Sequence, residues 1–189
     1  MTKSILLVGV GGQGTILASK LLTIGLMEAG YDVKMSEIHG MSQRGGSVSS
    51  HVRYGEKVAS PVIELGDADL LISFEKMEAL RYLQYLKTDG KVVVNNFEIN
   101  PLLVSSGKFE YSKDIIHEIS TKAKTIEMHA AKKAKELGDT KVMNIILLGS
   151  IIKLMNLTEI NWDKIIEENV KPAFININKR ALKVGMESV

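Results

Sequence analysis

The chain has 189 residues, enough for one domain with a sizeable core, and its 45% hydrophobic and 24% charged residues are typical of a soluble globular protein. A net charge of +2 gives no reason to expect nucleic acid or an acidic membrane surface as a partner. The absence of cysteine excludes disulfides, thiolate metal sites and cysteine-ligated iron–sulfur clusters, and it fits the reducing cytoplasm, where we expect the protein to reside.

The amino-terminal part predicts a strand, a glycine loop, a helix and a second strand. Residues 5–8 form a continuous apolar run that ends at Gly9, which is typical of a strand buried on both faces of a parallel sheet. From Thr15 the apolar positions suit a mostly buried helix that ends near Gly30, and a strand follows at residues 33–37. We therefore expect a right-handed βαβ unit.

The next segment predicts a strand with one polar face. Residues 47–54 alternate, and Ser47, Ser49, His51 and Arg53 share the polar side of a half-buried strand. Residues 57–60 are a possible return strand. Further patterns predict strands at 70–73, 92–94 and 125–128, helices at 77–86 and 114–123, a turn at 88–90 and a loop at 101–108.

From Ala130 the sequence is predominantly helical, with segments at 130–137, 141–155, 163–169 and 172–184. The longest apolar stretch, residues 142–155, contains Asn144, Ser150 and Lys153, so we expect a buried core helix and no membrane span. No signal-peptide cleavage pattern is visible at the start of the sequence. The sum is one α/β domain over residues 1–189, a Rossmann-like doubly wound, mostly parallel sheet with a helical C-terminal third.

The first glycine loop, Gly9-Val10-Gly11-Gly12-Gln13-Gly14, has the spacing of a phosphate-binding turn. Gly9 would permit the tight turn, Gly11 a close backbone approach to phosphate, and Gly14 close packing of strand and helix. The following helix N-terminus favours an anion, and Glu37 falls where a ribose-binding acid would lie. A bound dinucleotide and a loop that is structural or faces a partner both fit this pattern, and the second loop favours the latter.

The second glycine loop, His39-Gly40-Met41-Ser42-Gln43-Arg44-Gly45-Gly46, follows the second strand, so both loops should lie at one edge of the sheet. The guanidinium of Arg44 could clamp a phosphate or carboxylate, with support from the backbone amides of Gly45 and Gly46. Ser42 and Gln43 add neutral donors, and His39 could titrate. The alternative is a surface loop in which Arg44 pairs with Glu37 or another acid.

Together the two loops, with Ser60-Pro61, Ala68-Asp69, Asn144 and Leu148-Gly149, resemble the gamma-type domain of 2-oxoacid:ferredoxin oxidoreductases. Within that family the likeness is closest to the small (beta) subunits that act on indolepyruvate. The resemblance implies a large (alpha) partner subunit that holds thiamine diphosphate and [4Fe-4S] clusters. It also implies an aryl 2-oxoacid substrate, coenzyme A as co-substrate and ferredoxin as electron acceptor, with neither catalytic residue nor metal in this chain.

The candidate ligand-binding or partner-facing residues lie in the two loops and at the end of the second strand: Gly9, Gly11, Gly12, Gln13, Gly14, Glu37, His39, Ser42, Gln43, Arg44, Gly45 and Gly46. They would face the large subunit near the thiamine site or position the phosphates of coenzyme A. Two other classes remain open at this stage. One is a freestanding NAD(P)- or flavin-nucleotide-binding oxidoreductase, and the other is a purely structural module that stabilises a partner.

Overall fold

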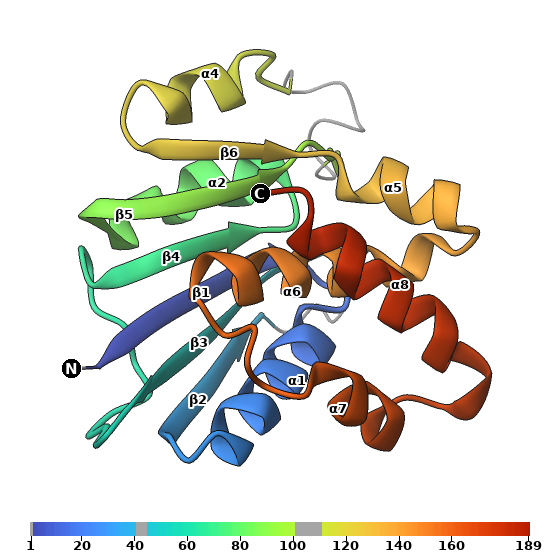
Figure 1. Ribbon diagram of the computed structural model, residues 1–189. Coiled ribbons are helices and arrows are strands. Elements are labelled where there is room, and N and C mark those ends of the chain that lie inside the picture. Colours follow the sequence, from blue (N-terminus) through green and yellow to red (C-terminus); the bar gives the residue numbers. More distant parts are fainter. Residues whose placement is uncertain (1, 41–44, 101–110) are drawn as a thin grey trace.

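The computed structural model describes residues 2–40, 45–100 and 111–189, and it places a six-stranded sheet between two layers of helices (Figure 1). The sheet order is β2-β3-β1-β4-β5-β6. The strands are β1 (Lys3–Val10), β2 (Asp32–His39), β3 (Ser47–Gly55), β4 (Ala68–Ser73), β5 (Leu86–Asn95) and β6 (Lys124–Met128). The helices are α1 (Thr15–Glu28), α2 (Lys76–Tyr82), α4 (Ile115–Ser120), α5 (Ala130–Leu137), α6 (Met143–Leu154), α7 (Trp162–Asn169) and α8 (Ile175–Met186), with short 3-10 turns η1 (Leu83–Tyr85), η2 (Thr140–Val142) and η3 (Pro172–Phe174).

Alternate residues of β1 enter two separate cores, which explains its continuous apolar run. Ile5 and Leu7 join a core formed with α1, α6, α7 and α8, while Leu6 and Val8 join a core formed with α2 and α4. Strands β1, β4, β5 and β6 run parallel to one another. The structure thus confirms the doubly wound, mostly parallel α/β fold and the helical C-terminal third.

The relation between β1 and β2 differs from the simple βαβ unit that the sequence predicts. Strand β3 lies between them and pairs antiparallel with both, so β1 and β2 share a direction without sharing hydrogen bonds. The half-exposed pattern of β2 suits the edge of the sheet, whereas β3 is buried on both faces. The second glycine loop therefore connects two hydrogen-bonded neighbours, β2 and β3.

The prediction that β3 is half-buried is wrong, because other parts of the chain cover its polar face. Ser49 and His51 are 1% and 2% exposed. The backbone N–H of Ile63 donates to Nδ1 of His51 at 3.1 Å, and the guanidinium of Arg53 donates to the carbonyl oxygen of Val62 at 3.0 Å. The segment between β3 and β4 thus supplies hydrogen-bond partners in place of water.

Two smaller expectations also differ from the structure. Residues 57–60 form no strand: the carbonyl oxygen of Lys57 accepts a hydrogen bond from the Thr2 hydroxyl at 3.4 Å, and the N–H of Val58 donates to the carboxylate of Asp32 at 2.8 Å, so side chains replace the ladder of a strand. The predicted turn at 88–90 lies inside β5, where the register against β4 shifts between Ala68 and Leu70 and accommodates the extra residues. The loop predicted at 101–108 lies outside the described residues.

Helices α6 and α8 cross with their backbones in direct contact. A Cβ added to Gly149 would lie 2.3 Å from the carbonyl oxygen of Leu182, and one on Gly185 would lie 1.9 Å from that of Ile146. Only glycine at both positions allows this approach, because any side chain would push the helices apart.

Candidate functional site

The two glycine loops meet at the carboxyl edge of the sheet. The backbone N–H of Gly11 donates to the carbonyl oxygen of Gly46 at 2.8 Å. The backbone N–H of Gly45 donates to the carbonyl oxygen of Gly11 at 3.5 Å. The shared position of the loops is therefore confirmed for the described part of the second loop. The same bonds occupy the amides of Gly11 and Gly45, which are no longer free for an anion.

The side chain of Gln13 braces the first loop. Its Oε1 accepts a hydrogen bond from the backbone N–H of Val10 at 2.7 Å, and its Nε2 donates to the carbonyl oxygen of Phe74 at 3.0 Å. A Cβ on Gly9 would lie 2.8 Å from that Oε1. Gly9 belongs to β1, so its role is to admit the brace, and the turn itself is made further along at Gly12 and Gly14.

Gly14 ties the loop to helix α6. It precedes α1 with φ of +81°, and its carbonyl oxygen accepts a hydrogen bond from Nδ2 of Asn144 at 3.2 Å. A Cβ on Gly14 would come within 2.6 Å of the same nitrogen. Gly12 also has a positive φ, +101°, but it is exposed and its Cβ position faces open space. The loop thus exposes its backbone at Gly12, while the hydrogen bonds of Gln13 and Asn144 hold the rest of the loop in place.

Glu37 and His39 lie at the end of β2, and the structure gives Glu37 a partner on α1. The Oγ of Ser19 donates to Oε1 of Glu37 at 3.3 Å, while His39 is exposed and its Nδ1 lies 3.3 Å from the carbonyl oxygen of Gly40. Ser42, Gln43 and Arg44 lie outside the described residues, so their roles stay predictions.

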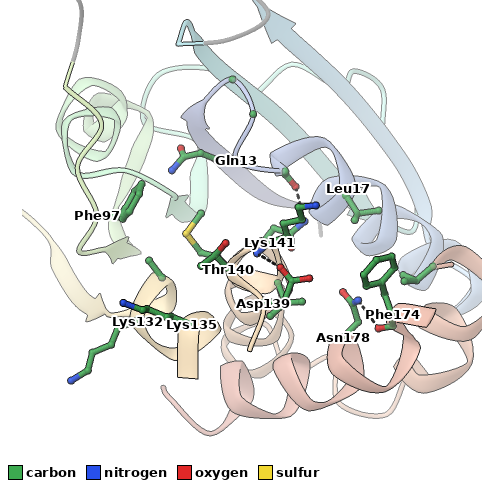
Figure 2. A pocket seen from close by; sticks show the side chains of 18 of the residues that line it. Gln13, Leu17, Phe97, Lys132, Lys135, Asp139, Thr140, Lys141, Phe174 and Asn178 are labelled. Atoms are coloured by element: carbon green, nitrogen blue, oxygen red, sulfur yellow. Dashed lines mark hydrogen bonds between the residues drawn. The ribbon is translucent and has the colours of Figure 1, made fainter. Parts of the chain in front are cut away.

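A large open cavity of about 1210 Å³ lies beside the first loop (Figure 2). Residues 11–14 form one wall, and the C-terminal elements α5, η2, α6, η3 and α8 contribute most of the others. The apolar lining includes Leu17, Phe97, Ile99, Val142, Met143, Val170 and Phe174. The sequence reasoning did not find this cavity, although the Lys-rich stretch at residues 130–137 is one of its borders.

The cavity is bordered by lysines that find no acidic partner among the residues that the structure describes. Asp139 is the one acid among the lining residues, and its Oδ1 accepts a hydrogen bond from the backbone N–H of Lys141 at 2.9 Å. Within the described part of the chain, none of the four lining lysines forms an ion pair: Lys132, Lys135, Lys141 and Lys171. This side of the site therefore favours negative charge.

Buried acids stand behind the second loop. Glu78 is 4% exposed, accepts a hydrogen bond from the Oγ of Ser47 and pairs with Arg81 at 3.3 Å. Burial raises the pKa of the Glu78 carboxyl, although the bonds to Ser47 and Arg81 oppose that change. Glu75 accepts hydrogen bonds from the backbone N–H of Glu78 at 3.0 Å and from the Tyr111 hydroxyl. The network holds the start of β3 against α2.

Over residues 2–40, 45–100 and 111–189, histidine, aspartate and glutamate nowhere gather in a group of three that could hold a metal ion. A search of the same residues finds no helix with the length and apolar character needed to cross a membrane.

The model of the family described as pyruvate ferredoxin/flavodoxin oxidoreductase matches residues 4–188. The chain is 38% identical to the indolepyruvate oxidoreductase subunit IorB of Thermococcus kodakarensis, over 98% of this chain and 95% of that one. Its fold is similar to the gamma subunit of a keto/oxoacid ferredoxin oxidoreductase from Geobacter sulfurreducens, with a TM-score of 0.72, 22% identity and coverage of 98% and 97% of the two chains.

It is also similar in fold to part of the 2-oxoglutarate:ferredoxin oxidoreductase from Magnetococcus marinus, with a TM-score of 0.76 and 18% identity, over 98% of this chain and 30% of that one. The family match and the full-length relative agree with the two-loop motif. The chain therefore belongs to the pyruvate ferredoxin/flavodoxin oxidoreductase family and is a small subunit of a 2-oxoacid:ferredoxin oxidoreductase.

Proposed function

We propose that the enzyme containing this subunit oxidatively decarboxylates an aryl 2-oxoacid such as indolepyruvate, forms an acyl-CoA and reduces ferredoxin in the cytoplasm. The observation that carries the proposal is the 38% identity to an indolepyruvate oxidoreductase subunit along almost the whole of both chains. A match confined to one loop would support a common fold only. A match along nearly the whole of both chains also includes the surfaces through which the subunit contacts its partners, and it therefore supports a common function.

The proposal assigns the redox chemistry to a large (alpha) partner subunit. This chain contains no cysteine, so it cannot supply the thiolates of a [4Fe-4S] cluster. Thiamine diphosphate and the clusters would therefore reside in the partner, and this chain would hold no cofactor alone. The isolated chain would be inactive, because it would lack both the thiamine diphosphate that reacts with the 2-oxoacid and the clusters that carry electrons to ferredoxin.

The edge formed by the two glycine loops would face the partner or the phosphates of coenzyme A. The amides of Gly11 and Gly45 are used between the loops, so the backbone near Gly12 and Gly14 and the N-terminus of α1 would carry the anion contacts. Arg44 would add a guanidinium that binds phosphate or carboxylate in a bidentate manner. Gly9, Gln13 and Gly46 would position this edge, with Glu37, His39, Ser42 and Gln43 bordering it.

Reconstitution tests the proposed function directly. The chain would be co-purified with its natural partners under anaerobic conditions, and reduction of ferredoxin or a viologen dye would be followed with each 2-oxoacid and coenzyme A. We expect a large iron–sulfur partner whose activity is lost when this chain is omitted. A chain that purifies alone with a bound nucleotide would instead indicate a freestanding Rossmann oxidoreductase.

Replacing Arg44 with alanine should raise the KM for coenzyme A in the reconstituted enzyme by about 10- to 100-fold, since hydrogen bonds to charged groups contribute about 1.5–3 kcal/mol. Arg180→Ala provides the matched control, because Arg180 is exposed on α8 and lies outside both loops. Unchanged kinetic constants for coenzyme A and for the 2-oxoacid would remove Arg44 from the site.

A further inference from the structure

We infer that the cavity beside the first glycine loop is a docking groove for a segment of the large partner subunit that carries carboxylates next to apolar anchor side chains. This inference rests on the proposed function, because it requires a partner subunit. It assigns the contact to one face of this chain, built from the first loop and the C-terminal helices (Figure 2).

The amide side chains of the cavity are already engaged within the chain. Both ends of the Gln13 amide are bound, Asn144 donates to Gly14, and Nδ2 of Asn178 donates to the carbonyl oxygen of Phe174 at 2.7 Å. Sites for small molecules usually orient their ligand with a few placed polar groups that are free to bind it. Here apolar walls remain, with long, exposed lysines and the Thr140 hydroxyl at their border, and an apolar centre with a polar rim is the arrangement of a protein–protein interface.

The size of the cavity and its aromatic residues also favour a protein segment over a small molecule as the occupant. Its volume of about 1210 Å³ exceeds the roughly 300–1000 Å³ that is usual for small-molecule pockets. Phe97, just after β5, is 36% exposed, and Phe174, in η3, is 42% exposed. Aromatic side chains are enriched among the residues that contribute most to protein–protein binding.

The charge of the border identifies the chemistry of the occupant. Four lysines that form no ion pair with the described residues border the apolar walls, and the one lining acid already accepts a backbone hydrogen bond. Complementary charge at the border of an interface directs association, while its apolar centre supplies most of the affinity. The matching segment therefore places aspartate or glutamate side chains around one or more aliphatic or aromatic residues.

The test uses the complex of both subunits and the double variant Lys132→Glu, Lys135→Glu. We expect its dissociation constant for the partner to rise at least tenfold, and wild-type affinity to fall as salt is raised. Lys20→Glu with Lys153→Glu is the matched control, because both lysines are exposed on helices, form no ion pair with described residues and lie outside the cavity. That variant should bind like the wild type.

The variant Phe174→Ala tests the apolar part of the groove and should weaken assembly without lowering the melting temperature of the isolated chain, since the ring is exposed. Normal assembly of the lysine double variant with a raised KM for coenzyme A would overturn the inference and assign the cavity to a small anion. Normal assembly with unchanged kinetics would overturn it as well. Failure of the wild-type chain to bind any partner would overturn the proposed function together with this inference.

Discussion

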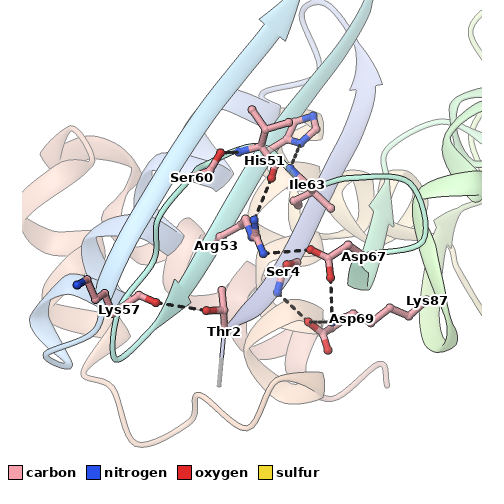
Figure 3. A network of polar contacts seen from close by, with 11 residues as sticks. Thr2, Ser4, His51, Arg53, Lys57, Ser60, Ile63, Asp67, Asp69 and Lys87 are labelled. Atoms are coloured by element: carbon pink, nitrogen blue, oxygen red, sulfur yellow. Dashed lines mark hydrogen bonds and ion pairs between the residues drawn. The ribbon is translucent and has the colours of Figure 1, made fainter.

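The charges at the amino ends of the parallel strands differ from those of the cavity lysines at the carboxyl ends. At the amino edge (Figure 3), Asp69 accepts from the backbone N–H of Ser4 at 2.8 Å and pairs with Lys87 at 3.1 Å, while Asp67 pairs with Arg53 at 3.1 Å. At the carboxyl edge, the lysines around the cavity have no acidic partner in the described ranges of the chain. The charges at the first edge are committed to the fold, whereas the cavity lysines at the second remain available for binding.

The shape of the carboxyl edge depends on backbone conformation, so its largest sensitivity should be at Gly14. Alanine there meets the unfavourable φ of +81° and the amide of Asn144, and we expect a loss of about 3 kcal/mol in the free energy of unfolding. Gly12→Ala is the control, because the φ is also positive but the space is open, and its loss should stay near 1–2 kcal/mol. Equal losses in urea unfolding would show that Asn144 does not confine the loop.

The amino edge should lose about 2 kcal/mol when Asp69 becomes asparagine, because Lys3, Lys87 and the N–H of Ser4 lose a charged acceptor. Burial acts to raise the pKa of Asp69, but the bonds from Ser4 and the two lysines outweigh it and lower the pKa. The stability from this carboxylate is therefore present above about pH 4 and is lost as the pH falls through its folded pKa.

Urea unfolding between pH 2 and pH 7 checks this, and Asp69→Asn should lack that part of the acid destabilisation. The control is Glu159→Gln, an exposed acid with no ion pair among the described residues. An unchanged acid profile in the Asp69 variant would place the acid sensitivity elsewhere.

Glu78, at the carboxyl edge, should show the opposite pH dependence with a smaller change. Because its folded pKa is raised by burial, the folded state binds its proton more tightly, and stability falls as the pH rises from about 4 through that raised pKa. Glu78→Gln removes this fall and still accepts from Ser47, so its stability at pH 7 should stay within about 1 kcal/mol of the wild type. A variant with the wild-type slope between pH 4 and pH 7 would contradict this assignment.

The sequence predicted the features that depend on local patterns. The apolar run of β1, the helix after Gly14 and the meeting of the two loops all follow from residue spacing near the amino terminus. The covered face of β3 did not follow, because alternation shows which side chains share a face and cannot show that the segment around Ile63 lies over it.

The cavity was beyond reach of such patterns for a related reason. It joins residues near Gly12 to residues near Phe174, and only tertiary packing brings these parts together. The lysines of α5 were visible as a basic helical stretch, but whether they pair with acids elsewhere in the described chain depends on tertiary neighbours that the sequence does not reveal. The close contact of Gly9 has the same origin, because its neighbour Phe74 follows β4 and is distant in the sequence.

The glycine contact between α6 and α8 fixes the width of the cavity during folding. Both helices line the cavity near their starts, at Asn144 and Asn178, and both are pinned further along, at Gly149 and Gly185. At this crossing the backbones touch directly, so there are no intervening side chains whose rotamer changes could let the helices slide. The two walls of the cavity therefore keep a fixed distance from each other. An incoming segment therefore meets a surface that is already ordered, and association loses little conformational entropy on this side of the interface.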